Sequence, residues 1–261
     1  MLNMNPLLKK TIFGASAFLL LLSFSSNIAQ EASLSPEDIL KRAEYKRSPW
    51  EQMSMMAELN TLINEKEKRS VYKVYFKDSE NTLVAFMEPK FEKGNILLMV
   101  GEDLWYYVRD TKKPTRITPV QKLSGSVSYG DLARLGWSKD YTIENHEEAR
   151  LHAKNVYILY LAAKSNGATY QKIKLWVDKD TFKPLQAEVF LLSGKLYKTL
   201  KFTQYQTIAG AEVNTQIEFT DHFNKDQKSI LDFTQVVQEK NIPNRYFIKT
   251  SLAVVSDEVC R

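Results

Sequence analysis

The sequence predicts a mainly β protein with one continuous antiparallel sheet. Roughly ten or eleven segments alternate apolar and polar residues or are uniformly apolar, and they recur about every 10–15 residues. Turn sequences such as Asn166-Gly167, Ser193-Gly194 and Ala209-Gly210 separate several of them. Only two stretches have helical character. Short connections between consecutive strands favour antiparallel pairing, so we expect these strands to share a single sheet.

The N-terminus has the layout of a secretory signal peptide. Lys9 and Lys10 precede an apolar, uncharged run over residues 12–24, and small or polar residues follow as far as Ala29. The run is about 13 residues long, whereas a membrane-spanning helix needs roughly 20. We therefore expect a signal peptide over residues 1–29, cleavage after Ala29 rather than an uncleaved anchor, and a single mature domain over residues 30–261 in the periplasm.

Cysteine content and charge exclude several classes of site. The one cysteine, Cys260, is far from the cleavage point, so a lipid anchor, an internal disulfide and a multi-cysteine metal site are not expected. Loss of Lys9 and Lys10 lowers the net charge from +5 to +3 (5 − 2). This weak, evenly spread charge does not favour nucleic-acid binding. We expect a monomer held by its hydrophobic core.

A helix is expected at the start of the mature chain, over residues 37–46. Ser35 can cap it, Pro36 suits its first position, and Ser48-Pro49 ends it. The expected strands then cover residues 71–77, 83–87, 96–100, 103–108, 156–163, 170–177, 185–192, 196–205, 213–219 and 230–237.

Between residues 111 and 141 the alternation stops, and prolines and glycines accumulate. A short helical stretch at residues 131–135 contributes to an apolar edge formed by Leu132, Leu135 and Trp137. Long connections in compact domains are often lids or binding loops. We therefore predict a lid that carries these three side chains and pivots at Gly125, Gly130 and Gly136.

Catalytic signatures are missing from the pattern. His146, His152 and His222 have no partner at a metal-ligand spacing, and no Gly-x-Ser-x-Gly elbow or glycine-rich phosphate loop occurs. Asp178 and Asp180 flank a turn, where aspartate is favoured for its bonds to the backbone. We expect no enzyme activity, no metal and no cofactor.

The clean strands each have one fully apolar face, which leaves two interpretations. The faces could form the core of a closed barrel or sandwich, or a long curved sheet could surround an apolar groove that helix and loop residues fill when it is empty. In the second case the groove residues are Val74, Phe76, Ile173, Leu175, Leu200, Phe202, Val213, Ile217, Phe219 and Phe233.

Three segments resemble the LolA/LolB-like family of outer-membrane lipoprotein-sorting proteins. Residues 101–107 (GEDLWYY) resemble its Gly-x-x-Leu-Trp-x-Tyr strand. Residues 115–132 resemble the Arg-Arg-Ile to Asp-Leu segment of a LolA-like branch whose cargo is uncertain, and residues 176–185 with 194–196 resemble the central hairpin of that branch. In order and spacing, the resemblance spans residues 35–250.

The resemblance implies a half-open β-barrel, a single curved sheet with the N-terminal helix and a loop helix over its concave face. It also implies a carrier that moves the acyl chains of a lipid or lipoprotein across the periplasm, between an inner-membrane transporter and an outer-membrane acceptor. This chain departs from the family at one place. The sorting carrier has an Arg-Pro after its second strand, and that arginine has a part in holding and transferring lipoprotein. Lys77-Asp78 stands there in this chain.

Two functions from different classes remain. The first is the carrier, whose groove residues are given above. The second is an envelope interaction protein with a permanently filled core, such as an accessory subunit of a lipid-exporting transporter. Its contact surface would be the basic and aromatic region formed by Tyr107, Arg109, Lys112, Lys113 and Arg116.

Overall fold

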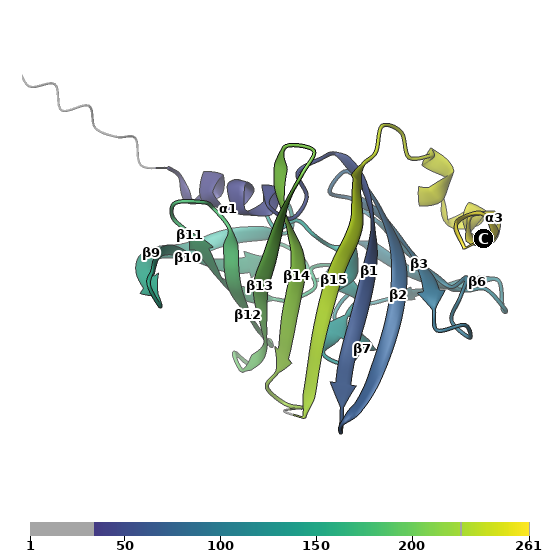
Figure 1. Cartoon of the computed structure of the whole chain (residues 1–261), viewed down its shortest axis with the longest axis horizontal. Coiled ribbons are helices and arrows are strands. Elements are labelled where there is room, and N and C mark those ends of the chain that lie inside the picture. The colour runs from purple at the N-terminus through teal and green to yellow at the C-terminus, as the bar shows by residue number, and fades with distance from the viewer. Residues whose placement is uncertain (1–33, 225, 261) are drawn as a thin grey trace, which may run out of the picture. The chain divides into compact units, whose positions relative to one another are not determined.

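Thirteen strands form one antiparallel sheet in the computed structural model, which describes residues 34–224 and 226–260 (Figure 1). The predicted signal peptide lies outside the described residues. The strands are β1 (Gln52–Ile63), β2 (Lys66–Lys77), β3 (Asn81–Glu88), β4 (Ile96–Val100), β5 (Asp103–Val108), β6 (Lys113–Ile117), β9 (Tyr141–Leu151), β10 (Lys154–Ala163), β11 (Lys172–Asp178), β12 (Pro184–Phe190), β13 (Leu196–Ile208), β14 (Ala211–Asp221) and β15 (Gln227–Gln238).

The strand order shows how the chain runs through the sheet. From β1 in the middle it proceeds strand by strand to the edge strand β6, and from the opposite edge strand β9 it returns to β15, which pairs with β1. The two edges are not paired with each other in the described sheet. The prediction of a mainly β protein with a curved antiparallel sheet that is not closed into a barrel is therefore confirmed.

One segment connects the two edges of the sheet. Residues 118–140, which we call the crossing segment, contain the small hairpin of β7 (Lys122–Ser124) and β8 (Val127–Ser128) and the helix α2 (Tyr129–Ala133). The loop predicted from residue 111 is thus partly wrong, because β6 extends the sheet first. The predicted helix begins two residues earlier than expected, since the Ser128 backbone N–H donates to the Asp131 carboxylate (2.8 Å) and closes the first turn.

The N-terminal helix α1 (Pro36–Tyr45) agrees with its prediction within one residue at each end. The Ser35 hydroxyl accepts a hydrogen bond from the backbone N–H of Asp38 (3.1 Å), which satisfies an otherwise unpaired donor at the helix start. Ile39, Leu40 and Ala43 are buried in the main hydrophobic cluster. Burial of this apolar side anchors α1 at one end of the sheet (Figure 1).

A C-terminal segment covers the other face of the sheet. The 3-10 helices η1 (Asn244–Phe247) and η2 (Lys249–Ser251) precede α3 (Leu252–Val259), and they form a second hydrophobic cluster with residues of β2 to β5. In β3, for example, Leu83 belongs to this outer cluster and Val84 to the main one. This two-sided burial explains why the sequence of β3 and β4 is continuously apolar rather than alternating.

Candidate functional site

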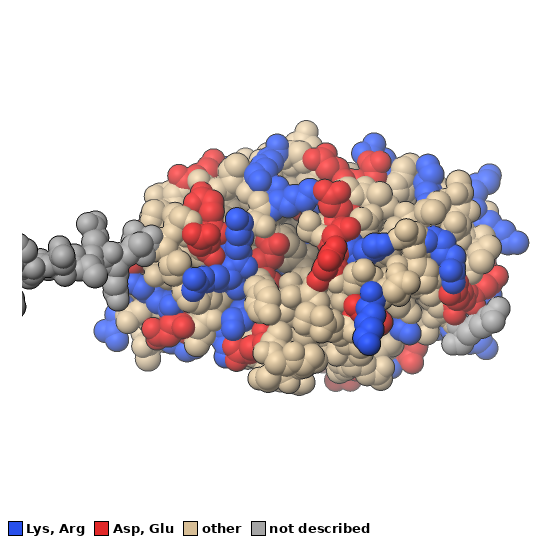
Figure 2. Space-filling model, turned by 90° about the horizontal axis from the view of Figure 1, so that it is seen from above, with Lys and Arg blue, Asp and Glu red and all other residues tan. Residues whose placement is uncertain are grey.

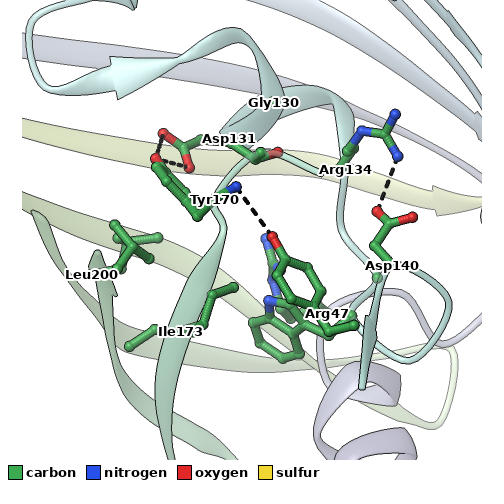
Figure 3. Close-up of a pocket in the computed structure, with 14 residues that line it drawn as sticks. Arg47, Gly130, Asp131, Arg134, Asp140, Tyr170, Ile173 and Leu200 are labelled. Carbon is green, nitrogen blue, oxygen red and sulfur yellow. Dashed lines mark hydrogen bonds and ion pairs between the residues drawn. The ribbon is translucent and has the colours of Figure 1, made fainter. Parts of the chain in front are cut away.

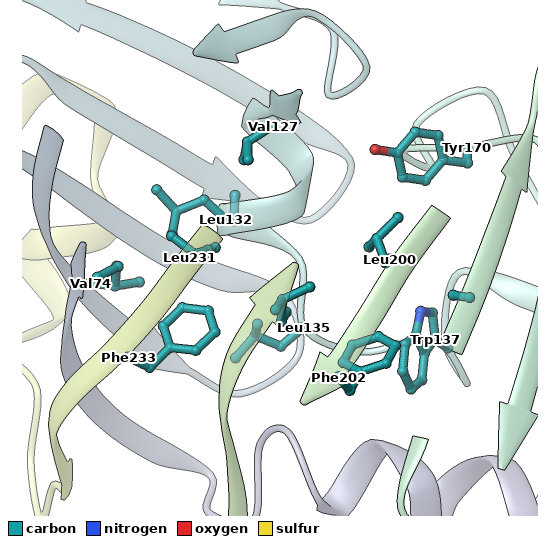
Figure 4. Packing of buried hydrophobic residues seen from close by; sticks show 14 of the residues in the cluster. Val74, Val127, Leu132, Leu135, Trp137, Tyr170, Leu200, Phe202, Leu231 and Phe233 are labelled. Atoms are coloured by element: carbon teal, nitrogen blue, oxygen red, sulfur yellow. The ribbon is translucent and has the colours of Figure 1, made fainter. Parts of the chain in front are cut away.

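The concave face of the sheet carries the predicted groove residues. All ten are buried, and every one except Val213 belongs to the main hydrophobic cluster, which β1 to β5 and β10 to β15 build together with α1 and the crossing segment. Val213 is buried outside that cluster. Figure 4 shows Val74 and Phe233 on one side of this core and Leu200 and Phe202 on the other. Nine of the ten residues therefore share one face, and the lipid-binding role of the whole set stays a prediction.

The predicted lid residues lie against this apolar face. Leu132, Leu135 and Trp137 are 1%, 6% and 6% exposed and belong to the same cluster (Figure 4). The Trp137 ring packs edge-on against Phe202, with 5.9 Å between the ring centroids. The crossing segment thus inserts its own apolar side chains where a ligand would otherwise contact the sheet.

Little space is left between the crossing segment and the sheet. A cavity of about 30 Å³ lies beside Arg47, Trp137 and Leu200, which is room for about one water molecule. A larger pocket of about 320 Å³ opens where α1 leads into β1, and its walls include Trp50, Phe76 and Leu135. The chain itself therefore fills much of the concave face under the crossing segment, and this mouth is open beside it.

A buried polar cluster connects the crossing segment to the sheet. The Lys198 ammonium of β13 donates to the Ser128 hydroxyl (2.6 Å) and the Tyr170 hydroxyl (3.2 Å), and lies 3.5 Å from the Asp131 carboxylate. The Tyr170 hydroxyl donates to both carboxylate oxygens of Asp131 (2.7 and 2.9 Å) (Figure 3). Burial lowers the pKa of Lys198 against the attraction of Asp131 and raises the pKa of Tyr170. The cluster depends on one carboxylate that the crossing segment supplies.

Arg47, directly after α1, is a second buried cation that contacts the crossing segment. Its guanidinium donates to the Leu135 carbonyl oxygen (2.8 Å) and lies 4.6 Å from the centre of the Trp137 ring. The same guanidinium lies 5.5 Å from the centre of the Phe202 ring. Burial lowers the pKa of Arg47 to about 10, so it remains charged at neutral pH. It therefore joins the crossing segment to α1 and β13 through a carbonyl and two aromatic faces.

Two further contacts fix the C-terminal half of the crossing segment. Arg134 donates to Asp140 (3.0 Å) and to the carbonyl oxygens of Gly101 and Glu102 in the β4–β5 turn (3.2 Å each). The Glu44 carboxylate of α1 accepts hydrogen bonds from the backbone N–H groups of Trp137 and Ser138 (2.7 Å each). All these contacts are polar and lie outside the strand pairing, so they can be broken without opening any strand pair of the large sheet.

The sequence pattern does not predict that Arg47 is buried. It contains a signal for the burial of Lys198, which our sequence analysis did not use. Positions 198, 200 and 202 face inward on β13, so a lysine at 198 interrupts an otherwise apolar face. A charged residue at an inward position is rarely fully buried unless it is paired. Arg47 lies at a helix end, where a basic residue is ordinary and solvent-exposed.

The residues considered for catalysis lie where the turn and edge interpretations put them. His146 and His152 are exposed on or beside the edge strand β9. The Asp178 carboxylate accepts hydrogen bonds from the backbone N–H groups of Asp180 and Thr181 (3.0 Å each), as its turn position predicts. Within residues 34–224 and 226–260, no group of three or more His, Cys, Asp and Glu side chains could hold a metal ion.

The proposed interaction surface differs from its prediction. Tyr107 is only 2% exposed, because the C-terminal segment covers it, so the expectation that it is exposed is wrong. Arg109 forms an ion pair with Asp257 of α3 (2.9 Å), and Arg116 pairs with Asp103. The two arginines of this region therefore have acidic neighbours of their own. None of the described helices is long and apolar enough to span a membrane.

Comparisons with known proteins agree with this architecture. A family model with the description of an uncharacterized protein matches residues 78–253. A search among curated proteins found no match. The matching solved structures include a LolA superfamily protein from Nitrosomonas europaea, with 29% identity over 83% of this chain and 98% of that one and a TM-score of 0.78.

Two other solved structures show the same fold at lower identity. A DUF1329 family protein from Desulfovibrio piger is 21% identical, and a protein named as an outer membrane lipoprotein-sorting domain from Vibrio parahaemolyticus is 19% identical. Each match covers 83% of this chain and 97% of the other, with a TM-score of 0.71. The chain belongs to the uncharacterized family that its residues 78–253 match, and it has the LolA-like fold of the Nitrosomonas europaea structure.

Proposed function

We propose that this protein is a periplasmic carrier that binds the acyl chains of a lipid or lipoprotein and moves them towards the outer membrane. The observation that carries the proposal is the way in which the concave face is covered. A continuous apolar surface lies under a segment that belongs to neither edge of the sheet and is held by a few polar contacts. The lipoprotein-sorting superfamily of its structural relatives supports the same function.

Magnitudes favour an exchange between the crossing segment and an acyl chain. Burial of a large apolar side chain stabilises by about 1.5–3 kcal/mol, so Leu132, Leu135 and Trp137 together contribute roughly 5–9 kcal/mol. An acyl chain of about twelve methylenes contributes about 10 kcal/mol at roughly 0.8 kcal/mol each. The two are close, so cargo can displace the segment and the segment can later displace the cargo. A carrier that must release its cargo needs this balance.

The mouth described above gives the acyl chain a place to enter. Its walls combine the apolar side chains of Phe76, Met99 and Leu135 with the carboxylates of Glu51 and Asp78. Figure 2 looks onto the α1 end of the sheet and shows basic and acidic side chains interspersed over it. The charged residues that line the mouth itself, Glu44, Glu51 and Asp78, are all acidic and offer no attraction to an anionic head group. We therefore infer that burial of apolar surface rather than long-range attraction drives loading.

The carrier function is tested by the lipid that the protein holds. Protein purified from its own cell envelope should release a lipid or acylated peptide on solvent extraction, which mass spectrometry would identify. After delipidation it should take up an uncharged diacylglycerol that carries a fluorescent acyl chain. Recovery of no lipid together with no uptake of this probe would contradict the proposal.

We expect Leu135→Asp to slow lipid release by about tenfold or more, because the altered crossing segment displaces the cargo less readily; the change corresponds to about 1.4 kcal/mol or more. A carboxylate at this 6% exposed position cannot pack against the apolar face, so the closed position of the crossing segment loses stability. Stopped-flow release of the fluorescent diacylglycerol measures the rate, and circular dichroism checks that the sheet is retained. Val254→Asp, at a 66% exposed site on α3, is the matched control and should release lipid at the normal rate. An unchanged release rate in folded Leu135→Asp would refute the lid assignment.

The second candidate, an interaction protein with a permanently filled core, is favoured by one observation. The cavity beside Trp137 and Leu200 measures only about 30 Å³, and the apolar face is covered. On this alternative the crossing segment never leaves the sheet, and no variant of it changes lipid binding. The release measurements above therefore separate the two functions.

A further inference from the structure

Asp131 occupies the polar end of the apolar face in the way that an acidic ligand would. It is 6% exposed, and its carboxylate lies against Lys198 and Tyr170, which are 1% and 5% exposed. The two donors come from parts of the chain outside the crossing segment, since Lys198 is in β13 and Tyr170 directly precedes β11. The acceptor comes from the segment that moves in the proposed function.

Departure of the crossing segment would leave these donors without their anion. Lys198 would lose Asp131 and Ser128 and keep Tyr170, whose hydroxyl would lose both of its acceptor oxygens. The Tyr170 backbone would stay fixed, because its N–H donates to the hydroxyl of Tyr141 in β9 (3.2 Å). An ammonium and a hydroxyl would then face the space that the carboxylate had filled.

Other charges around this site do not replace Asp131. Asp221 lies opposite Lys198 on β14 and attracts it, but its carboxylate accepts hydrogen bonds from the backbone of Phe223 and Asn224 (2.8 and 2.9 Å) and from the Asn224 amide (3.1 Å). It is therefore held in its own turn. Lys122 of β7 is a further cation near Lys198, and it belongs to the crossing segment.

The apolar positions next to Lys198 form a track for a hydrocarbon tail. Leu200 and Phe202 face the same side of β13 as Lys198, and Phe219 and Ile217 stand opposite them on β14. Inward positions on one strand are about 6.6 Å apart, so Lys198 and Phe202 are separated by roughly 13 Å along β13. A head group at Lys198 would thus continue into a tail of about ten methylenes over these four side chains.

We propose that the cargo carries an acidic head group, a carboxylate or a phosphate, which takes the place of the Asp131 carboxylate between Lys198 and Tyr170. The inference rests on the proposed carrier function and names the chemical class of its cargo. Asp131 is then an internal substitute for the ligand, and it keeps Lys198 paired whenever no cargo is bound. An uncharged lipid would leave Lys198 buried without a counter-ion and would bind more weakly.

Matched ligands test the preference directly. Calorimetric titration of the delipidated protein with laurate and with dodecanol compares one tail with and without a carboxylate. Dioctanoyl phosphatidic acid and dioctanoylglycerol make the same comparison for a phosphate. We expect the acidic member of at least one pair to bind tenfold or more tightly than its uncharged partner, and the pair that shows the larger ratio identifies the head group.

Variants at the two ends of the contact complete the test. Lys198→Met should abolish the acidic preference and strengthen the binding of dodecanol and dioctanoylglycerol, because no buried ammonium then lacks a counter-ion. Asp131→Asn should strengthen the binding of acidic and uncharged ligands alike, because the internal competitor is lost. If Lys198→Met does not fold, the double variant Asp131→Asn/Lys198→Met, which removes both charges, should also lose the acidic preference. Equal affinities for acidic and uncharged ligands in the native protein, unaltered in these variants, would overturn the inference while the carrier function stands. Failure of every ligand to bind would instead contradict the carrier function.

Discussion

Asp131→Asn is expected to lower the free energy of unfolding by about 3–5 kcal/mol, because it leaves the ammonium of Lys198 buried without its counter-ion. The amide keeps the shape of the carboxylate, so lost charge rather than lost volume causes the effect. Urea unfolding followed by circular dichroism measures the change. The double variant Asp131→Asn/Lys198→Met should recover most of the loss, since it contains no unpaired charge. Equal losses in the single and double variants would contradict the explanation.

The same variant has an expected pH dependence. Burial holds the pKa of Lys198 below its ordinary value of 10.5, and loss of Asp131 removes the main attraction that opposes this shift. Between the folded and the unfolded pKa the unfolded chain binds more protons, so stability rises with pH in that window. The destabilisation of Asp131→Asn should therefore be largest near neutral pH and shrink as the pH approaches 10.5. A loss that stays constant over this range would show that Lys198 does not cause it.

Gly125→Ala is expected to cost about 2–5 kcal/mol, with contributions from both backbone strain and overpacking. Gly125 lies in the β7–β8 turn with φ of +54°, and an added Cβ would lie 2.2 Å from Thr61 Cγ2 and 2.4 Å from Ser229 Oγ. Those two side chains belong to β1 and β15, so the turn rests directly on the sheet. The Ser126 backbone N–H also donates to the Ser229 hydroxyl (3.0 Å), a bond that the methyl group would disturb.

Gly210→Ala is the control for the backbone contribution. Gly210 has a φ of +80° in the β13–β14 turn, and nothing lies within 4 Å of its added Cβ. This variant should cost only about 1–2 kcal/mol, from strain alone. The difference between the two free energies of unfolding isolates the close approach of the crossing segment to the sheet. If the two variants lose the same stability, the β7–β8 turn does not depend on this contact.

These glycines also bear on the pivots predicted from the sequence. Gly125 and Gly130 both pack closely, since an added Cβ on Gly130 would lie 2.2 Å from Thr169 Oγ1. A Cβ added to Gly136 would lie 2.9 Å from the Glu44 carboxylate oxygen Oε1. In the closed position the three glycines therefore allow close packing. Their part in a movement stays a prediction.

Much of the sheet could be predicted because its strands alternate cleanly or are uniformly apolar. β1 was missed because methionines and polar residues mix in it, and Met53, Met55 and Ala57 face inward without the β-branched residues that indicate a strand. β9 was missed because it is a charged edge strand with few buried positions. The C-terminal helix α3 was missed, and with it the cover on the outer face that makes β3 and β4 apolar on both sides.

The candidate site has a part that could be predicted from the sequence and a part that could not. Its apolar part could be predicted, because inward positions repeat every second residue and Leu132, Leu135 and Trp137 stand out in a polar connection. Its polar part could not, because Arg47, Asp131, Tyr170 and Lys198 are distant in the sequence and meet only when the crossing segment folds over the sheet. Periodicity locates a face, whereas a buried ion pair needs the contact between two separate elements.

The pairing of β1 with β15 has a consequence for the order of folding. Strands β1 to β6 and β9 to β15 are two meanders of neighbouring hairpins, which can form through local contacts, whereas the seam between them pairs Ile63 with Gln227. Loop-closure entropy makes such distant pairing slow. During synthesis β1 is made first and waits for β15, with its apolar face and one row of backbone groups unpaired. The newly made chain is thus most prone to aggregate at this seam, and its aggregation hazard ends only when the last strand arrives.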